Sequence, residues 1–484
     1  MRFVSTVRAG DEAAPSVSLK TALFEGLAPD GHLYVPERIE PWSAEDVEAL
    51  CAQSLIETGV SVLRPFVADE IPSRTLASIV DRALTFPIPL VQVEPRVFAL
   101  ELFHGPTLAF KDVGARVLAG LMAALHDDPQ PLTILAATSG DTGSAVGHAF
   151  QGVEGIRVVI LYPDGRVSPT QEAQLTMFNH VERSNVRAYA VAGVFDDCQR
   201  LVKSAFADPG LRDRMRLTSA NSINIGRLLP QMIYYFHAAG RLKIAGPDGS
   251  RSPGRATSSD GSRAASRATS SDVARGFSRA MSSDVARGFS RAIFSVPSGN
   301  FGNLAAGLMA RRAGAPIDGF IAATNANDVV PRYLGTGRFE PRASIATIAN
   351  AMDCGNPSNF DRLQWLYSGG VEEMRRDVEG SVHTEAEVAR TIRRVYEERN
   401  YLLDPHSAIA YLGARAAMAI SGESDAVSAV FLATAHPAKF AEVVEPIIGE
   451  PVAIPEPLAA ALGAPRSILR LPPTLDALRE TLRG

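Results

Sequence analysis

The sequence predicts an α/β fold in which parallel sheets are covered by helices. From about residue 90 onward, short apolar runs alternate with segments whose apolar residues recur at helical spacing. Several of these runs end in loops rich in glycine, serine or asparagine, as strand-to-helix turns do. A chain of 484 residues with 46% hydrophobic and 21% charged residues can bury a large core spread over two or three domains. We therefore expect parallel-sheet domains flanked by helices, with an extra N-terminal domain.

The expected elements follow the chain in three units. Residues 1–90 form the N-terminal unit, with a Pro-interrupted helical region over 45–58, a helix over 73–83 and no catalytic pattern. Residues 91–440 form the second unit, with strands expected at 133–137, 158–161, 186–191, 292–296, 317–323 and 426–432. Its helices are expected at 113–125, 144–150, after the N-cap Ser168, and at 196–206, 304–312, 384–399 and 407–420. Residues 441–484, interrupted by prolines, are expected to form a C-terminal extension.

Residues 245–292 break the alternation. Three twelve-residue copies begin at Arg255, Arg267 and Arg279, and the segment is rich in serine, arginine, glycine and alanine. Because it holds few large apolar side chains, we expect a disordered surface insertion. Eight arginines against three aspartates between residues 250 and 292 leave a nucleic-acid tether as the alternative.

Composition excludes several classes of function. The formal net charge of −5 gives no electrostatic case for nucleic acid, so we expect no nucleic-acid partner. No stretch approaches the ~20 apolar residues of a membrane span, and no signal-peptide pattern is visible, so we expect a cytoplasmic protein. The three cysteines are widely spaced and none of the nine histidines has a ligand partner at metal-binding spacing, so we expect neither disulfides nor a metal.

Lys111 is the strongest catalytic candidate. It follows a Gly-Pro turn at 105–106 and an apolar run, and it precedes the expected helix at 113–125. A helix N-terminus and apolar neighbours both lower the pKa of an ammonium group, which a Schiff-base lysine requires. Only five lysines are present, and Lys20 and Lys439 have no Gly-Pro turn beside them. The alternative is an ordinary lysine at a helix start, with its head in water.

Two strand-to-helix loops could bind anions. Residues 298–303 place Gly299 and Gly302 where backbone N–H groups would point at a phosphate, although a turn that needs glycine only for steric reasons explains them equally well. Residues 138–143 form a second such loop. There Asp141 would repel an anion unless it is turned away, and its alternative role is an N-cap.

Two further segments offer polar side chains. Residues 221–227 combine two amides, a hydroxyl and Arg227, which suits a phosphate, or alternatively a helix cap with a surface arginine. Thr434 follows the last expected strand, where it could meet a ring nitrogen of a cofactor or cap the helix that starts near Pro437.

Five motifs, in order, resemble the threonine synthase family, whose members are pyridoxal-phosphate (PLP) lyases of fold type II, the tryptophan-synthase-β-like fold. They begin at residues 104, 137, 221, 297 and 433 and read HGPTLAFKD, ATSGDTG, NSINIGR, PSGNFGN and ATAHPAKF. The N-terminal segments 18–23 and 26–31 also match, and the pattern is similar to the bacterial and fungal branch.

The resemblance implies a role for each motif. Lys111 would bond covalently to PLP, and Thr434 would hydrogen-bond its pyridine nitrogen. The PLP phosphate would be held mainly by backbone N–H groups of Gly299, Asn300, Phe301, Gly302 and Asn303. The substrate carboxylate would bind the loop of Ser139, Gly140, Asp141 and Thr142. The substrate phosphate would bind Ser222, Asn224 and Arg227, together with Thr138.

The resemblance further implies conversion of O-phospho-L-homoserine and water to L-threonine and phosphate, the last step of threonine biosynthesis, by a monomer or homodimer. Lys111 would move protons at Cα and Cβ, and the released phosphate, held by Arg227, would deprotonate the attacking water. One alternative is a serine/threonine dehydratase of the same fold, which would need no phosphate-binding Arg227. Another is a non-catalytic phospho-ligand-binding relative, which retention of Lys111 disfavours.

Overall fold

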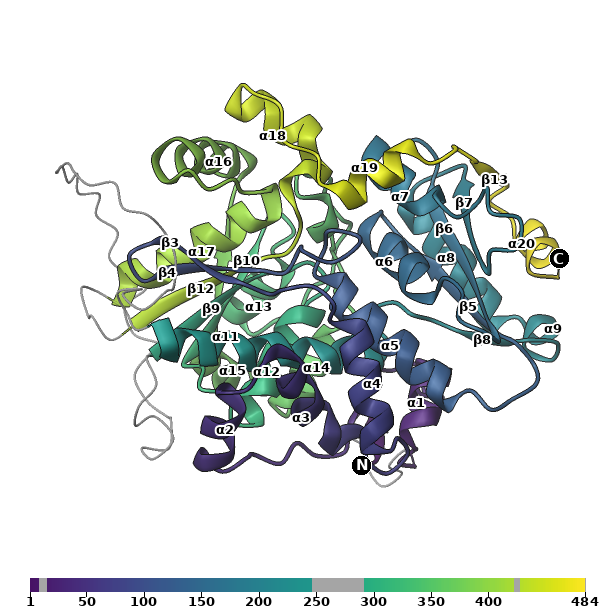
Figure 1. Cartoon of the computed structure of the whole chain (residues 1–484), viewed down its shortest axis with the longest axis horizontal. Helices are drawn as coiled ribbons and strands as arrows, with labels where there is room; N and C mark the ends of the chain where they lie inside the picture. The colour runs from purple at the N-terminus through teal and green to yellow at the C-terminus, as the bar shows by residue number, and fades with distance from the viewer. Residues whose placement is uncertain (8–14, 246–290, 422–426, 484) are drawn as a thin grey trace.

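The computed structural model describes residues 1–7, 15–245, 291–421 and 427–483. It confirms the α/β prediction, since two sheets of largely parallel strands carry helices on their faces (Figure 1). The predicted repeat insertion lies, apart from its first and last residues, outside the described part of the chain. Among the described helices, none is both long and apolar enough to cross a bilayer.

The N-terminal unit is a two-stranded antiparallel ribbon with four helices. Its elements are β1 (Phe3–Ser5), α1 (Leu19–Glu25), β2 (Tyr34–Pro36), α2 (Ala44–Cys51), α3 (Leu55–Val67) and α4 (Ser73–Ala83). The helical region expected over 45–58 is interrupted, as predicted, but not by a proline. Ser54 has extended backbone angles, and its side chain forms a capping box with Glu57, so a new helix begins there.

The larger sheet has six strands in the order β11-β10-β9-β12-β4-β3, and only the edge strand β3 is antiparallel to its neighbour. Its strands are β3 (Leu90–Glu94), β4 (Val97–Glu101), β9 (Arg291–Pro297), β10 (Gly319–Thr324), β11 (Val378–Val382) and β12 (Val427–Ala433). The helices and 3-10 turns around it are α11 (Met232–Ala245), α12 (Gly302–Arg312), α13 (Val329–Thr336), η2 (Asn350–Met352), α14 (Phe360–Leu366), α15 (Val371–Asp377), α16 (Glu385–Arg399), α17 (Pro405–Ser421), η3 (Pro437–Phe440) and α18 (Ala441–Ile448).

The smaller sheet has five parallel strands in the order β13-β7-β6-β5-β8 and lies beside the larger one (Figure 1). Its strands are β5 (Leu132–Ala137), β6 (Ile156–Pro163), β7 (Val186–Val191), β8 (Arg216–Thr218) and β13 (Leu469–Leu471). The elements around it are α5 (Lys111–Leu125), α6 (Asp141–Phe150), α7 (Pro169–Thr176), α8 (Phe195–Ala207), α9 (Pro209–Arg212), α10 (Ile225–Leu228), η1 (Leu229–Gln231), α19 (Glu456–Gly463) and α20 (Leu475–Arg483).

The C-terminal residues are tied into this smaller sheet. Strand β13, from the expected extension 441–484, forms the edge of the sheet beside β7. The domain boundaries expected near residues 90 and 440 stay predictions. One apolar core joins the N-terminal helices to both sheets, so the core does not mark where one domain ends. That core contains Leu76 of α4, Leu118 of α5 and Ile134 of β5.

Candidate active site

Lys111 is held by a rigid loop at the start of α5. The Asp112 carboxylate accepts hydrogen bonds from the Thr107 backbone N–H (2.9 Å) and hydroxyl (2.7 Å), which closes the loop. A Cβ on Gly105 would lie 2.4 Å from Asp112 Oδ2, so only glycine fits there. Lys111 is the first residue of α5, so the helix and the closed loop before it fix its backbone position.

Two loops that are far apart in the sequence pair at Lys111. Ala109 and Ala435 form an antiparallel bridge, the Phe110 N–H donates to the Thr434 carbonyl (2.9 Å), and the His436 N–H donates to the Leu108 carbonyl (3.0 Å). This pairing brings Thr434 beside the lysine. The alternative in which Thr434 caps the following helix is wrong, because His436 caps η3 through its ring nitrogen.

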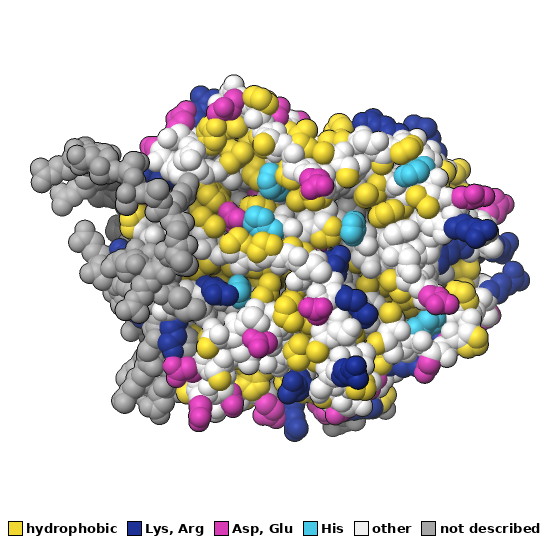
Figure 2. Space-filling model, viewed as in Figure 1, with side chains coloured by type: hydrophobic (Ala, Val, Ile, Leu, Met, Phe, Trp, Pro, Cys, Tyr) yellow, Lys and Arg dark blue, Asp and Glu magenta, His cyan; other side chains and the backbone are white. Residues whose placement is uncertain are grey.

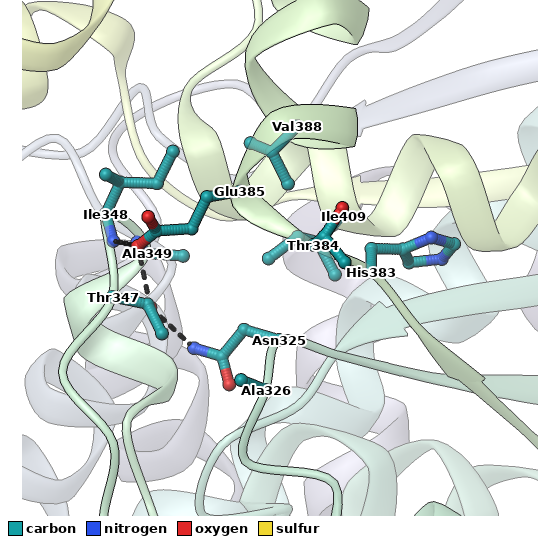
Figure 3. A pocket seen from close by; sticks show the side chains of 10 residues that line it. All are labelled: Asn325, Ala326, Thr347, Ile348, Ala349, His383, Thr384, Glu385, Val388 and Ile409. Atoms are coloured by element: carbon teal, nitrogen blue, oxygen red, sulfur yellow. Dashed lines mark hydrogen bonds between the residues drawn. The ribbon is translucent and has the colours of Figure 1, made fainter.

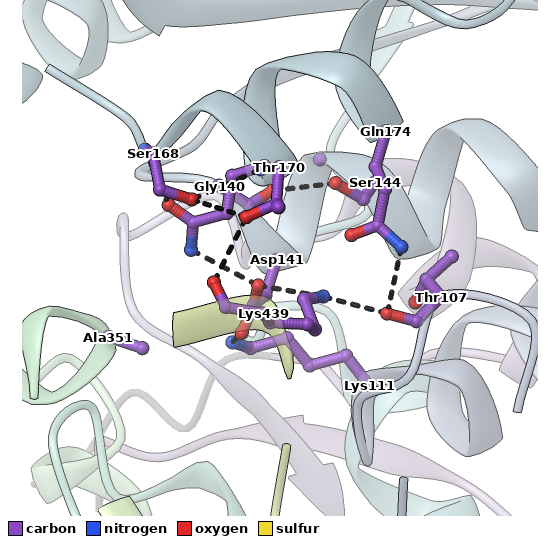
Figure 4. A network of polar contacts seen from close by, with 12 residues as sticks. Thr107, Lys111, Gly140, Asp141, Ser144, Ser168, Thr170, Gln174, Ala351 and Lys439 are labelled. Atoms are coloured by element: carbon purple, nitrogen blue, oxygen red, sulfur yellow. Dashed lines mark hydrogen bonds and ion pairs between the residues drawn. The ribbon is translucent and has the colours of Figure 1, made fainter. Parts of the chain in front are cut away.

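Asp141 connects two lysines (Figure 4). Its Oδ2 lies 3.4 Å from Lys111 Nζ, and its Oδ1 lies 2.9 Å from Lys439 Nζ. Gln171 also donates to Oδ1 (3.2 Å). The Lys111 side chain is 15% exposed, whereas Lys439 is fully buried. Asp141 is not an N-cap, because that position is Gly140, and its carboxylate is turned toward the lysines.

The charges of this cluster oppose one another. Burial lowers the pKa of Lys111, the Asp141 carboxylate opposes that shift, and Lys439 and Arg227 add to it. Burial by itself would raise the pKa of Asp141, but Lys439 and Lys111 outweigh burial and hold that pKa well below its ordinary value. The site thus combines a permanent carboxylate with a lysine biased toward its neutral form, which is the nucleophilic form of an amine.

The loop before α6 is shaped by Thr138. Its buried hydroxyl accepts hydrogen bonds from the N–H groups of Gly140 (3.0 Å) and Gly143 (2.9 Å). Gly140 has φ 136°, and a Cβ there would lie 2.5 Å from the Gln171 side chain. Ser139 and Thr142 stay partly exposed beside this fixed loop, so they can contact a ligand.

The start of α12 fits an anion. Phe301, at its N-cap, has φ 60°, and within the described chain no side chain caps the first turn. A Cβ on Gly299 would lie 2.6 Å from the Met352 Cα, so glycine lets the loop pass close to η2. Tyr234 and Tyr235 hold Asn303 through its Oδ1 (2.7 and 2.8 Å), and its buried Nδ2 has no hydrogen-bond partner among the described residues.

A second amide lies next to this helix start. Arg362 Nη1 donates to Asn359 Oδ1 (2.6 Å), and because a guanidinium only donates, the other amide atom, Nδ2, must face away from it. A Cβ on Gly302 would lie 3.3 Å from that Nδ2. The Nδ2 is buried and lacks a partner among the described residues, as Asn303 Nδ2 does. These donors suit the phosphate that the resemblance implies.

The segment 221–227 lies against the same loop. The Asn300 amide donates to the Ser222 hydroxyl (2.7 Å). Arg227 is buried, its Nη1 donates to the Ala220 carbonyl (2.6 Å), and its Nε has no partner among the described residues. Burial lowers the pKa of Arg227 to about 10, so it stays charged at neutral pH. The alternative of a surface arginine is therefore wrong.

Asn224 matches the helix-cap alternative. Its Oδ1 accepts from the Gly226 N–H (3.0 Å), and its Nδ2 donates to the carbonyls of Leu23 (2.8 Å) and Ser219 (2.9 Å). The side chain thus fixes the start of α10, which carries Arg227, against the N-terminal unit.

The sequence reasoning missed Lys439 and Asn359. Lys439 lies in the matched motif ATAHPAKF, and its place in that motif could have marked it as a candidate site residue. Asn359 gave no signal, since it depends on a contact with buried Arg362, which lies outside the matched motifs in sequence and reaches residues 222–223 only in the folded protein.

A small cavity lies between residues 347–349 and the start of α16 (Figure 3). Its volume of about 30 Å³ is room for roughly two water molecules. The lining residues are Asn325, Ala326, Thr347, Ile348, Ala349, His383, Thr384, Glu385, Val388 and Ile409, none of which is a predicted site residue. In the described ranges, no group of three His, Cys, Asp or Glu side chains could hold a metal ion.

Comparison with known proteins decides the family. The model "Threonine synthase N terminus" matches residues 2–84, and the model "Threonine synthase, C-terminal" matches residues 407–482. Threonine synthase from Serratia marcescens is 38% identical over 97% of this chain and 96% of its own length. The chain belongs to the threonine synthase family. The resemblance of its five motifs is thereby confirmed across nearly the whole sequence.

Solved structures of this family agree in fold. The PLP-bound threonine synthase from Brucella melitensis has a TM-score of 0.82 at 36% identity, covering 100% of this chain and 99% of that one. Threonine synthase from yeast has a TM-score of 0.81 at 27% identity, covering 100% and 98%. The predicted bacterial and fungal branch is therefore confirmed as well.

Proposed function

We propose that the protein converts O-phospho-L-homoserine and water to L-threonine and phosphate with PLP as cofactor. The observation that carries this proposal is the placement of Lys111. It is the first residue of a helix, largely buried, paired with Asp141 and within electrostatic reach of Arg227. A dehydratase would have no use for the buried positive charge of Arg227, because its substrate carries no phosphate.

The cofactor would be held by three groups of residues. Lys111 would bond to its aldehyde, the N–H groups of residues 299–303 would hold its phosphate, and Thr434 would hydrogen-bond its ring nitrogen. The Nδ2 atoms of Asn303 and Asn359, which have no hydrogen-bond partner in the described part of the chain, support a phosphate at the start of α12. When bound, PLP supplies an electron sink for negative charge that develops at the substrate Cα.

The substrate would lie between the two loops. Ser139, Gly140 and Thr142 would bind its carboxylate at the start of α6, in the loop that Thr138 fixes. The Asp141 carboxylate is ion-paired with Lys439 and lies 3.4 Å from Lys111 Nζ, and these two positive charges offset its repulsion of an anion. Arg227 and Ser222 would bind the substrate phosphate, and Asn224 would hold α10 in place.

Lys111 would move the protons. Once the substrate amine has displaced it from the cofactor, its freed Nζ would accept the proton that the substrate Cα releases and then carry protons at Cβ. Its lowered pKa favours the neutral amine that this role requires. The released phosphate, held by Arg227, would take the proton from the attacking water.

The test supplies O-phosphohomoserine and PLP and measures threonine and phosphate. We expect equal amounts of both products, and Lys111→Ala should lower the turnover at least about 10²–10⁴-fold because the proton carrier is lost. The matched control is Lys203→Ala, which changes an exposed lysine of α8 and should turn over at the parent rate. Parent-rate turnover by Lys111→Ala would overturn the proposal.

We also propose that the protein acts in the cytoplasm as a monomer or homodimer, without nucleic acid. The net charge of −5 supports the absence of a nucleic-acid partner, as do the intermixed acidic and basic side chains on the face shown in Figure 2. Sedimentation at equilibrium tests the oligomeric state, and a mass above that of a dimer would contradict it.

A further inference from the structure

Lys439 is a fully buried cation that the proposed reaction does not use. It lies on η3, four residues after the end of the pairing segment at Ala435. Its Nζ contacts Asp141 Oδ1 (2.9 Å) and donates to the Thr107 carbonyl (2.7 Å), which lies in the loop that carries Lys111 (Figure 4). Burying an ammonium group is costly unless it is paired, so these contacts fix its position.

The two lysines do not share Asp141 equally. The 2.9 Å contact to Lys439 is an ordinary hydrogen-bonded ion pair, whereas the 3.4 Å contact to Lys111 is longer than such a bond. Gln171 adds a second donor on the oxygen that Lys439 occupies. The carboxylate is therefore committed to Lys439, and it is a weak partner for Lys111.

We propose that Lys439 is a positioning residue that occupies Asp141 and the Thr107 carbonyl, and so keeps the Lys111 amine available for bonding to a carbonyl carbon. This inference deepens the proposed function, on which it rests, by assigning a second lysine to the same site.

Three charged groups face Lys111, each from a different element. They are Asp141 from α6, Lys439 from η3 and Arg227 from α10. Burial lowers the pKa of Lys111 most, Asp141 raises it, and Lys439 lowers it further. Farther out, His406 faces Asp141, and Asp112 faces Lys439. Removing Lys439 would leave Asp141 to pair with Lys111 alone, and that pairing favours the protonated amine.

Opposite changes at the two partners test this role. We would acetylate PLP-free protein with acetic anhydride across a pH series and quantify the Lys111 peptide by mass spectrometry, because only the neutral amine reacts. Lys439→Met should shift the midpoint of Lys111 reactivity upward by about one pH unit or more, and Asp141→Asn should shift it downward. Lys203→Met, on the exposed face of α8, is the matched control and should leave the midpoint unchanged.

General loss of structure would not reproduce these opposite shifts. If Lys439→Met does not fold by circular dichroism, Lys439→Gln is measured instead, because its amide can still donate to the Thr107 carbonyl. An unchanged midpoint in the Lys439 variant, or shifts of both variants in one direction, would overturn the role of Lys439. The assay needs neither PLP nor turnover. Its result can therefore contradict the role of Lys439 while the proposed reaction stands, and the reaction can be disproved while the role of Lys439 stands.

Discussion

Thr434 is the residue that we propose offers a neutral hydroxyl to the ring nitrogen of PLP. Its backbone carbonyl accepts the Phe110 N–H (2.9 Å), which ties it to the residue before Lys111. A hydroxyl can donate or accept, so it does not force a proton onto the nitrogen as a carboxylate would. The role proposed for Thr434 therefore depends on one hydrogen bond.

Replacing that hydroxyl should weaken cofactor binding. Thr434→Val has nearly the same shape but cannot form the hydrogen bond, so we expect the PLP dissociation constant to rise about tenfold. Titration of PLP-free protein followed by cofactor absorbance measures this change. Thr434→Ser keeps the hydroxyl and should bind PLP close to the parent level, so equal affinities of all three proteins would contradict the role.

Single residues differ in how well the sequence revealed them. The position of Lys111 at the start of a helix was predictable because its Gly-Pro turn and the helix after it are local features. The burial and pairing of Lys439 were not, because they depend on Asp141 and Thr107, which reach it only after the chain has folded. The orphan Nδ2 of Asn359 likewise exists only in the folded protein.

The segment that begins α14 links the site to the N-terminal unit. Arg362 is fully buried and donates to the carbonyls of Tyr34 (3.0 Å), Ser222 (2.9 Å) and Ile223 (2.7 Å) as well as to Asn359. Burial lowers the pKa of Arg362 to about 9. One side chain therefore fixes the position of the segment that carries Ser222 and the orientation of the amide beside Gly302.

Loss of Arg362 should destabilise the fold. Arg362→Met leaves four acceptors without their charged donor, so we expect the free energy of unfolding to fall by about 3 kcal/mol or more. Urea denaturation of the PLP-free protein measures it. The matched control is Arg376→Met, at an exposed position of α15, which should change stability by less than about 0.5 kcal/mol. Similar losses in both variants would contradict the account of Arg362.

Asn359→Asp tests the anion site at the start of α12. The two side chains have the same shape, but the aspartate puts a negative charge where the amide donor faces Gly302. We expect PLP to bind at least about tenfold more weakly, since a charge-assisted donor is replaced by repulsion. Asn356→Asp, which changes an exposed residue nearby in sequence, is the control. Unchanged affinity in Asn359→Asp would place the phosphate elsewhere.

Elements were predictable where the signal was local. Ser168 was predicted as an N-cap from its position before Pro169, and it is the N-cap of α7 in a capping box with Gln171. The break between α2 and α3 was attributed to a proline, whereas its cause is the capping box of Ser54 and Glu57, which starts a new helix.

The stability of the whole molecule should depend on pH through buried histidines. Burial lowers the pKa of both His237 and His436 to about 4, whereas the unfolded chain has an ordinary value near 6.5. Between these values only the unfolded chain takes up the protons. The free energy of unfolding should therefore be highest above pH 6.5 and fall as the pH drops toward 4.

His237→Gln isolates one of these contributions. The His237 ring lies 3.1 Å from the Ile88 carbonyl through Nε2, and a glutamine amide can replace that donor without titrating. Between pH 6.5 and 4, the free energy of unfolding should fall by about 3 kcal/mol less in the variant than in the parent protein. Urea denaturation at several pH values measures it, and an unchanged slope would contradict the assignment.

The presence of parallel sheets covered by helices follows from the alternation of strands and helices, which the sequence displayed. The order of the strands within each sheet was not predictable, because neighbours such as β12 and β4 pair across most of the chain. The meeting of the Lys111 loop with Thr434 follows from that pairing, since β12 delivers Thr434 to the same edge of the sheet.

Identification of the lysine that bonds to PLP tests the central claim most directly. Two lysines touch Asp141, so the choice between them is open to direct measurement. Borohydride reduction of the PLP-loaded protein makes the bond permanent, and mass spectrometry of its peptides locates the added group. We predict modification of Lys111 alone. Modification of Lys439, or of neither lysine, would contradict the account.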